Sequence, residues 1–323
     1  TRPTARYTRT WTQLSRSSAI TSTGNVAGAR RDVAITKSRD LVRANFLAMG
    51  SPCELLVETT SAREARRIGD IVAGEAWRIE DKFSRYLPDN IVDRINRGNE
   101  VTVDDETANL LDFSATLFHM SDGRFDITSG VLREAWTFDG SDSIPAAADV
   151  QRILDRVGWR KVDWERPRLK LGQGMQIDFG GIAKEYAVDK AVAMVAAETD
   201  EACLVNFGGD LAAHNAPSNS DGWQVGIDAL DPAEGKTRKR VRLKNGGLAT
   251  SGDARRFLLK DGIRYSHILD PTTGWPIAGA PRSITVAADT CTQAGMLATL
   301  AMLRGTLAES FLLEQRVQYW ILD

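Results

Sequence analysis

The pattern of apolar and polar positions along the chain predicts a mixture of helices and strands. Residues 62–83 place apolar side chains at helical spacing and form the clearest predicted amphipathic helix. Further helices are predicted at 105–121, 146–157, 182–198 and 292–303. Predicted strands lie at 48–58, 175–179, 203–207, 223–227, 240–243, 256–259, 263–269, 283–287 and 318–322. Because helices and strands mix without a regular βαβ alternation, the pattern favours an α+β fold.

Composition narrows the class of protein. The chain has 323 residues, of which 42% are hydrophobic and 26% are charged, so a globular chain of one large domain or two intimate lobes is expected. Its formal net charge of −2 argues against a general nucleic-acid binder, which carries a basic excess. No apolar run approaches the ~18 residues of a membrane-spanning helix. We therefore expect no nucleic-acid partner and no membrane span.

The N-terminal stretch differs from the rest of the chain. Residues 1–40 carry eight Lys and Arg but two Asp and Glu, and nothing in 1–28 resembles the apolar core of a signal peptide. We expect a basic, Ser/Thr-rich arm at 1–44, flexible or packed on a neighbour, followed by one main domain at 45–323. The three cysteines are far apart, which favours buried apolar residues over a zinc site or a disulfide.

Glycine pairs mark three candidate ligand-binding junctions. D-F-G-G-I-A-K (178–184) joins a predicted strand to a helix, and paired glycines at a helix start let an anion approach free N–H groups. N-F-G-G-D (206–210) repeats the glycine pair, and T-S-G-D (250–253) is expected to place hydroxyl groups in a turn. N-G-G (245–247) and D-G (261–262) are expected to be hairpin turns. A purely structural glycine turn remains the alternative at each junction.

Among the histidines, His267 has the most suggestive position. It is predicted to end a strand just before the turn D-P-T-T-G (270–274), where it could act as a general base. A satisfied surface histidine beside a β-turn is the equally simple alternative. The chain lacks G-x-x-x-x-G-K-[ST], and G-Q-G (172–174) lacks the third glycine of a dinucleotide fingerprint, which excludes the simplest nucleotide-binding classes.

Several motifs occur together in one order along the chain. They are M-G-S (49–51), F-S-R-Y (83–86), D-G-R-F-D-I-T-S-G (122–130), D-F-G-G-I-A-K (178–184), Y-A-V-D (186–189), N-F-G-G-D (206–210), A-T-S-G-D (249–253), Y-S-H-I-L-D-P-T-T-G (265–274) and A-T (298–299). In these motifs, over about residues 45–323, the chain closely resembles the ApbE family of FAD:protein FMN transferases.

The resemblance implies a fold and an activity. The expected fold is a mixed, two-lobed ApbE-like (T-fold-like) architecture with FAD bound between the lobes. With Mg²⁺, members transfer FMN from FAD to a Ser or Thr hydroxyl of a target protein and release AMP, and some mainly hydrolyse FAD. The expected partner is a flavin-acceptor protein, typically a subunit of a membrane redox complex. Many members are periplasmic or otherwise exported bacterial proteins, so we expect the same location here.

The resemblance also assigns roles to individual residues. His267 is expected to act as a catalytic base or orienting group, with Asp270 as the second catalytic residue and Thr273 shaping its turn. The residues expected to contact FAD are Met49, Ser84, Tyr86, Asp126, Gly180, Gly181, Lys184, Gly208, Gly209, Asp210, Ser251, Gly252 and Thr273.

The expected metal site departs from the family in two places. Family members bind the metal through an Asp and a Thr of A-D-A-L-A-T and through the Ala carbonyl of G-G-I-A-K. Thr299 and Ala183 match, but Gly295 stands where the Asp belongs, and Glu185 replaces a usual glycine. An oxygen-ligated Mg²⁺ site without its carboxylate should bind more weakly.

Two function hypotheses therefore stay open. In the first, an active transferase uses Glu185 as the replacement metal ligand. In the second, Glu185 is a solvated first-turn acid favoured by the helix dipole, and the protein is a non-catalytic FAD-binding protein or an FAD diphosphatase.

Overall fold

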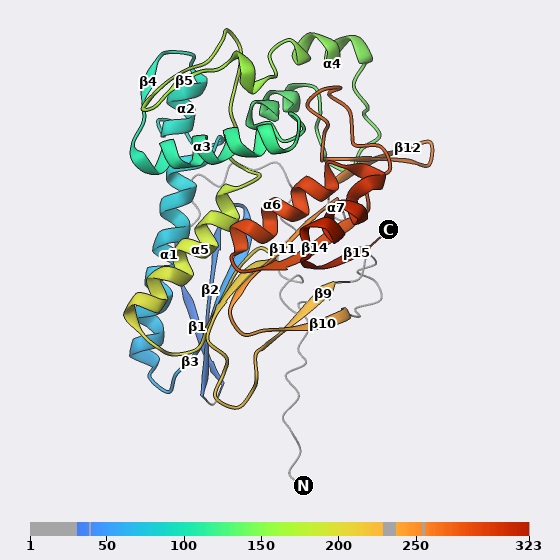
Figure 1. The fold of residues 1–323 in the computed structure, drawn as a ribbon. Helices are drawn as coiled ribbons and strands as arrows, with labels where there is room; N and C mark the ends of the chain where they lie inside the picture. Colours follow the sequence, from blue (N-terminus) through green and yellow to red (C-terminus); the bar gives the residue numbers. More distant parts are fainter. Residues whose placement is uncertain (1–30, 39, 229–236, 254–255, 323) are drawn as a thin grey trace.

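The fold is built on one eight-stranded sheet, in which every neighbouring pair of strands is antiparallel (Figure 1). The structure is a computed structural model and describes residues 31–38, 40–228, 237–253 and 256–322. In spatial order the strands are β1 (Ala34–Ser38), β2 (Leu41–Ala48), β3 (Ser51–Glu58), β7 (Cys203–Phe207), β8 (Asp210–His214), β11 (Gly246–Gly252), β14 (Ser283–Ala288) and β15 (Gln318–Leu322).

Helices cover one face of this sheet and a hairpin covers the other. The helices are α1 (Ala62–Phe83), α5 (Ala183–Glu198) and α6 (Cys291–Met302), with η5 (Gly305–Leu307) and α7 (Ala308–Gln315) following (Figure 1). The period-2 alternation of the strands separates two cores. Val205 and Phe207 belong to the helix-side core, whereas Leu204 of the same strand packs with Trp223 of the hairpin. That hairpin is formed by β9 (Trp223–Asp228) and β10 (Thr237–Leu243).

A second lobe lies beyond the upper ends of the helices in Figure 1. It contains α2 (Ile91–Asn96), α3 (Asp105–Met120), η2 (Ile127–Glu134), α4 (Ala147–Leu154), η3 (Trp159–Lys161) and a small sheet of β4 (Val101–Thr102), β5 (Asp163–Glu165) and β6 (Arg168–Lys170). The hairpin of β12 (Phe257–Lys260) and β13 (Ile263–Ser266) adds its Leu258 to a core with Trp136 and Val150. This core ties the segment around His267 to η2 and α4.

The strongest sequence patterns were the most accurate guides to the fold. Helix α1 and strands β7 and β15 have the bounds that their patterns predict, and D-G (261–262) turns between β12 and β13 as expected. The mixed α+β class is confirmed. The three cysteines are free and buried, as predicted. Within the described residues, no helix is both long and apolar enough to cross a membrane.

The strand predicted at 175–179 is wrong. The segment is buried, but it pairs with no strand in the described part of the chain. Ile177 instead donates its N–H to Asn96 Oδ1 (2.7 Å) and accepts from Asn96 Nδ2 (3.1 Å), and Asp178 N–H bonds to the Ile127 carbonyl (2.9 Å). A side-chain amide thus satisfies backbone groups that a sheet would otherwise pair.

The turns predicted at 245–247 and 250–253 are also wrong, because most of these residues form β11. Strand β11 lies between β8 and β14, and β10 pairs with β9 instead. Its glycines serve close packing: a Cβ on Gly247 would lie 2.1 Å from the Cys291 nitrogen at the start of α6. Ser251 and Gly252 therefore lie in a strand, and the strand predicted at 263–269 ends at Ser266, one residue before His267.

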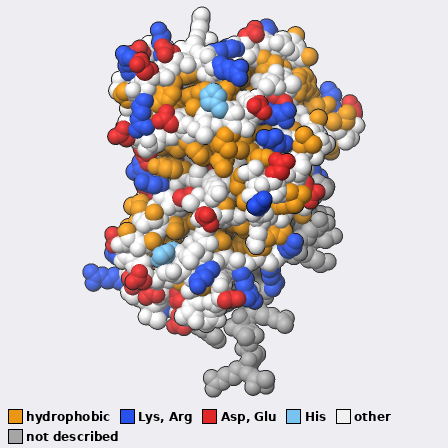
Figure 2. All heavy atoms as spheres, in the orientation of Figure 1, with side chains coloured by type: hydrophobic (Ala, Val, Ile, Leu, Met, Phe, Trp, Pro, Cys, Tyr) orange, Lys and Arg blue, Asp and Glu red, His pale blue; other side chains and the backbone are white. Residues whose placement is uncertain are grey.

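The proposed arm at 1–44 overlaps the sheet. Residues 1–30 lie outside the described part, but Val33 is buried, β1 pairs with β2, and the 44/45 boundary falls within β2. The folded domain therefore begins before residue 45. On the face shown in Figure 2, Lys and Arg mix with Asp and Glu, which agrees with the small net charge.

Candidate functional site

The first turn of α5 is where several of the predicted motifs meet. Helix α5 begins at Ala183, directly after the exposed pair Gly180 and Gly181. No side chain caps this helix start, but the N–H groups of Ile182 and Ala183 both bond to the Phe179 carbonyl, at 2.9 and 2.8 Å. Among the described hydrogen bonds, the N–H groups of Gly181 and Lys184 have no partner and are open to an anionic ligand. Asp178 holds the preceding loop in place, because its Oδ1 accepts the Gly180 N–H at 2.8 Å. The geometry suits the expected phosphate-binding role of this junction.

Lys184 connects this helix start to the second glycine junction. Its Nζ lies 2.7 Å from Asp210 Oδ2, and Asp210 Oδ1 accepts the Thr250 N–H of β11 at 3.2 Å. Burial opposes the ammonium charge, but the carboxylates of Asp210 and Glu185 outweigh it and raise the pKa of Lys184. Lys184 therefore keeps its positive charge, and Asp210 is its main ion-pair partner.

Gly208 brings the M-G-S turn to the same place. It has a φ of +64°, and a Cβ there would lie 2.7 Å from Ser51 Cβ and 3.9 Å from Lys184 Nζ. Met49 is also left-handed at +52° and donates its N–H to Glu80 Oε1 at 2.8 Å. Three chain segments that are distant in sequence thus converge beside the start of α5.

A pair of arginines links Asp178 to the F-S-R-Y motif. Asp178 Oδ2 lies 3.5 Å from Arg85 Nη1 and 3.7 Å from Arg133 Nε, and Arg133 also donates to the Tyr86 hydroxyl at 2.5 Å. Gly130 permits this approach, since a Cβ there would lie 2.7 Å from Asp178 Cβ. Tyr86 is 67% exposed although Arg85 Cζ lies 5.9 Å from its ring centroid, so much of the ring surface remains open to a further contact.

His267 lies within the electrostatic range of Arg133. Burial is the main reason that its pKa falls to about 4, and the charges of Arg256 and Arg133 add to the effect. Its Nδ1 lies 3.1 Å from the Arg256 carbonyl oxygen. Because a carbonyl only accepts, Nδ1 carries the proton in that bond, and the neutral ring presents an unprotonated Nε2. His267 is therefore a neutral proton acceptor above pH 5.

The D-P-T-T-G turn is held by its own side chains, as expected. Asp270 Oδ1 accepts from the Thr272 N–H (2.8 Å) and hydroxyl (2.5 Å), and Thr273 Oγ1 accepts the Trp275 N–H at 3.2 Å. Trp136 anchors the turn by donating its indole N–H to the Gly274 carbonyl at 2.8 Å. Asp270 is thus a residue that shapes the turn; its carboxylate has no contact with His267 among the described hydrogen bonds.

Two predicted cofactor-binding residues are occupied by protein contacts. Asp126 is buried, and its carboxylate accepts from the Thr128 N–H and hydroxyl and from the Trp159 N–H. Burial nevertheless raises its pKa. Ser84 caps the end of α1 and accepts the Tyr86 N–H at 3.2 Å. Asp126 and Thr273 do line one open cavity of about 720 Å³ between η2, α4 and the D-P-T-T-G turn.

The three predicted metal-binding residues lie on two neighbouring helices. Ala183 and Glu185 belong to the first turn of α5, and Thr299 lies one turn beyond Gly295 on α6. The Glu185 side chain points at Gly295, so it is not a solvated first-turn acid. Burial, then repulsion by Asp210, raises its pKa to about 8. The described residues contain no group of three or more His, Cys, Asp or Glu side chains that could hold a metal.

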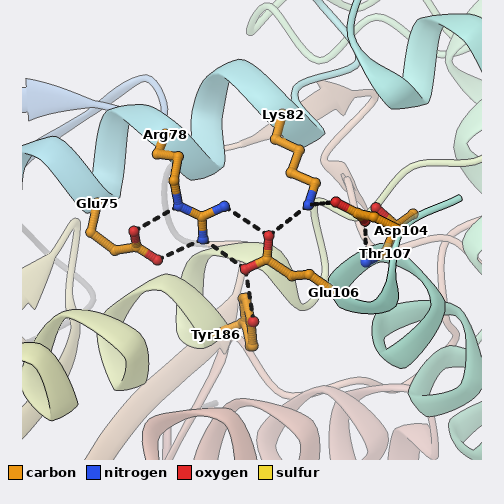
Figure 3. A network of polar contacts seen from close by, with 7 residues as sticks. All are labelled: Glu75, Arg78, Lys82, Asp104, Glu106, Thr107 and Tyr186. Atoms are coloured by element: carbon orange, nitrogen blue, oxygen red, sulfur yellow. Dashed lines mark hydrogen bonds and ion pairs between the residues drawn. The ribbon is translucent and has the colours of Figure 1, made fainter.

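An ion-pair network that the sequence pattern does not predict holds α1, α3 and α5 together (Figure 3). Arg78 contacts Glu75 at 2.7 and 2.8 Å and Glu106 at 2.7 and 2.6 Å. Glu106 also accepts from Lys82 Nζ (2.7 Å) and from the Tyr186 hydroxyl (2.9 Å). Hydrogen bonds from Arg78 above all lower the pKa of Glu106 to about 2. Only the Glu75–Arg78 spacing within one helix is visible in the sequence.

A second contact missed by sequence reasoning fixes α6 against α5. Asp189 of α5 accepts the N–H groups of Cys291 and Thr292, at 2.7 and 2.8 Å, in the first turn of α6. The Y-A-V-D motif was the available signal, because an acid at this place can cap the positive end of a helix.

Comparison with known proteins identifies the family. The sequence model of the ApbE family matches residues 49–321. The chain is 27% identical to the FAD:protein FMN transferase of Vibrio cholerae, over 70% of each chain. It is 26% identical to that of Salmonella typhimurium, over 81% of this chain and 85% of the relative. The crystal structure of the ApbE protein from Thermotoga maritima matches with a TM-score of 0.78 and 30% identity, over 87% of this chain and 94% of that one. The chain belongs to the ApbE family.

Proposed function

We propose that this protein is an FAD:protein FMN transferase. It transfers FMN from FAD to a Ser or Thr hydroxyl of an acceptor protein and releases AMP. The observation that carries the proposal is the uncapped start of α5, which Asp178 and Arg133 connect to the surroundings of a neutral His267. The relatives named FAD:protein FMN transferase support a transferase over a protein that merely binds FAD.

The site residues divide the work between binding and proton transfer. The N–H groups of Gly181 and Lys184 hold the pyrophosphate oxygens, where the helix dipole favours negative charge. Arg133 lies between this helix start and His267 and adds positive charge. The exposed Tyr86 ring offers a surface to one of the two ring systems of FAD.

Transfer requires one bond to form and one to break at the FMN phosphorus. The acceptor hydroxyl oxygen attacks that phosphorus, and the bond from phosphorus to the bridging oxygen breaks. AMP leaves with the bridging oxygen, and His267 Nε2 takes the hydroxyl proton. A general base of this kind contributes ~10²–10⁴-fold. Asp270 acts through the turn that follows His267.

A magnesium ion fits the oxygen donors of the site. The Ala183 carbonyl and the Thr299 hydroxyl are hard oxygen ligands of the type Mg²⁺ prefers. When bound, the ion supplies charge neutralisation to the pyrophosphate and the leaving group. The buried Glu185 oxygen that has no hydrogen-bond partner supports the presence of a cation here.

The acceptor is proposed to be a subunit of a membrane redox complex, and the protein to act outside the bacterial cytoplasm. Both proposals rest on the family resemblance. Fractionation of cells that express the full-length gene, with flavin fluorescence of separated membrane proteins, tests them together. Loss of a fluorescent membrane subunit on gene deletion supports the proposal, and a purely cytoplasmic signal contradicts it.

The activity test incubates the protein with FAD and Mg²⁺ and follows two products. AMP should appear only in step with covalent flavin fluorescence on a Ser/Thr-containing acceptor peptide. AMP without a flavinylated acceptor would identify an FAD diphosphatase. FAD binding without any AMP would overturn the enzymatic reading.

A further inference from the structure

Glu185 occupies space that Gly295 leaves open on the facing helix. An added Cβ at Gly295 would lie 2.6 Å from Glu185 Cγ, 2.7 Å from its Oε1 and 2.9 Å from its Cδ. Both residues point into the interface between α5 and α6. In this conformation the Glu185 side chain fills the space that glycine leaves at 295, and a side chain at 295 would have to displace it.

The Glu185 carboxylate lacks a full set of partners. Its Oε2 is shielded from solvent and accepts no hydrogen bond. The other acids nearby are engaged: Asp210 by Lys184 and the Thr250 N–H, and Asp189 by two N–H groups of α6. A buried polar oxygen without a partner is costly, and a buried charge more so. A cation at this oxygen would remove that cost.

Two further oxygen donors lie on the same two helices. Thr299 is four residues beyond Gly295 on α6, so the two positions share one helix face. The Thr299 hydroxyl has no hydrogen-bond partner within the described residues. Ala183 lies two residues before Glu185 in the first turn of α5. The Asp189 cap fixes the register of the two helices and therefore the position of all three donors.

We propose that Glu185 is the carboxylate ligand of a divalent cation held between α5 and α6, together with the Thr299 hydroxyl and the Ala183 carbonyl. The inference deepens the proposed function, because this cation would neutralise the pyrophosphate of FAD. The ligand comes from the opposite helix to the one that carries it in the family pattern. An all-oxygen donor set with one carboxylate selects Mg²⁺ or Mn²⁺ over soft metals.

The experiment measures metal binding directly, without turnover. Mn²⁺ is titrated into the full chain and free Mn²⁺ is followed by electron paramagnetic resonance, with Mg²⁺ competition as a second titration. Glu185→Gln keeps the shape of the side chain and removes its charge. We expect Mn²⁺ affinity to fall at least ~10-fold in Glu185→Gln, because affinity follows the charge of the ligands.

Glu198→Gln is the matched control. It changes the same side chain on the same helix, but Glu198 lies at the surface in an ion pair with Arg67. Its Mn²⁺ affinity should equal that of the wild type. Equal affinities for all three proteins would overturn the proposal and leave Glu185 as a buried neutral acid, for which Gln is a faithful substitute.

A swap variant separates loss of a ligand from loss of fold. Glu185→Gly combined with Gly295→Asp moves the carboxylate to α6 and should restore Mn²⁺ affinity, whereas Glu185→Gly alone should not. The melting temperature gives an independent readout: Mg²⁺ should raise it in the wild type and the swap variant, but not in Glu185→Gln. A swap variant that folds but binds no Mn²⁺ would contradict the proposed location.

The two proposals fail in different ways. Mn²⁺ binding that depends on Glu185, in a protein that releases no AMP from FAD, would support the metal site and reject the transferase. AMP release and acceptor flavinylation that persist with unchanged Mn²⁺ affinity in Glu185→Gln would support the transferase and reject the metal site.

Discussion

Glu106 contacts helix α5 and Glu185 belongs to it, yet the environments of the two glutamates are opposite. Glu106 accepts hydrogen bonds from Arg78, Lys82 and Tyr186, and its pKa falls to about 2. Glu185 leaves one oxygen unpaired, and its pKa rises to about 8. Two adjacent residues of α5 thus have different roles: Tyr186 donates a hydrogen bond to Glu106, and Glu185 keeps an unpaired oxygen. The residues of Figure 3 form a holding region, and the α5 start with Glu185 and His267 forms a reacting region.

The contrast shows how a carboxylate can lack hydrogen-bond partners while the helix that carries it stays in place. The holding region fixes α5 to α1 and α3 through fully paired charges. Helix α5 can then carry an unpaired carboxylate towards α6, because its own position does not depend on that group. Two factors distinguish the glutamates: Glu185 is the more deeply buried, and Glu106 has more hydrogen-bond donors around its carboxylate.

The largest expected effect lies in the reacting region. His267→Ala should lower AMP release from FAD by ~10²–10⁴-fold, because a general base is removed. FAD affinity, measured by fluorescence titration, and melting temperature should change little. His119→Ala, at an exposed site near the end of α3, is the control and should retain full activity. Unchanged turnover in His267→Ala would make His267 a structural residue.

A smaller effect, on stability, is expected in the holding region. Arg78→Met leaves Glu75 and Glu106 without their shared guanidinium and should lower the free energy of unfolding by ~1–3 kcal/mol. Urea denaturation measures it. Arg152→Met breaks an exposed ion pair with Asp149 and should change stability by less than ~0.5 kcal/mol.

Glu185→Gln sharpens this comparison, because in the absence of metal it should leave the free energy of unfolding unchanged or raise it. A loss as large as that of Arg78→Met would mean that Glu185 also belongs to the holding region.

Gly208→Ala should have an intermediate to small effect. The left-handed backbone costs ~1–2 kcal/mol for a residue with a side chain, and the new Cβ would also meet Ser51 at 2.7 Å. Gly98→Ala has a similar φ of +83° but open space around its Cβ. The excess loss in Gly208→Ala over Gly98→Ala therefore measures the close approach of the M-G-S turn. Equal losses would show that this approach is relaxed in solution.

The last effect is a dependence of stability on pH. The Glu106 pKa falls from 4.5 to about 2 on folding, so the unfolded chain binds the proton more readily in this range. The stability that Glu106 contributes is complete above pH 4.5 and is lost as pH falls towards 2. Urea denaturation at pH 6 to 2.5 should show a steeper loss for wild type than for Glu106→Gln. Parallel curves would contradict the lowered pKa.

The sequence predicts the elements whose apolar pattern lies within one segment. It does not predict the structure of segments that depends on contacts with residues far away in the sequence. The apolar repeat at 62–83 reports one buried helix face, and α1 follows it. The alternating segment 175–179 reports burial equally well, but Asn96 rather than a strand receives its hydrogen bonds. Residues 246–252 contain three glycines and read as a turn, although the glycines make room for α6 and β14 in a central strand.

The residues of the candidate site also fall into two groups, those that motifs predict and those that only the structure reveals. Motif spacing identified Lys184, Asp210 and His267, because each belongs to a recognisable run. The roles of Arg133 and Asp189 depend on which segments meet in space, and a single sequence does not record that. Glu185 is an intermediate case: the missing carboxylate at 295 suggested a replacement, and the structure places the Glu185 side chain against Gly295.

The tight fit between Glu185 and Gly295 also constrains how such an arrangement can arise by mutation. In the present conformation a Cβ at 295 would lie 2.6 Å from Glu185 Cγ, so a chain with side chains at both positions has to turn the flexible Glu185 side chain away from α6. The effect of a substitution at one position therefore depends on the residue at the other. The two positions are expected to change together rather than independently.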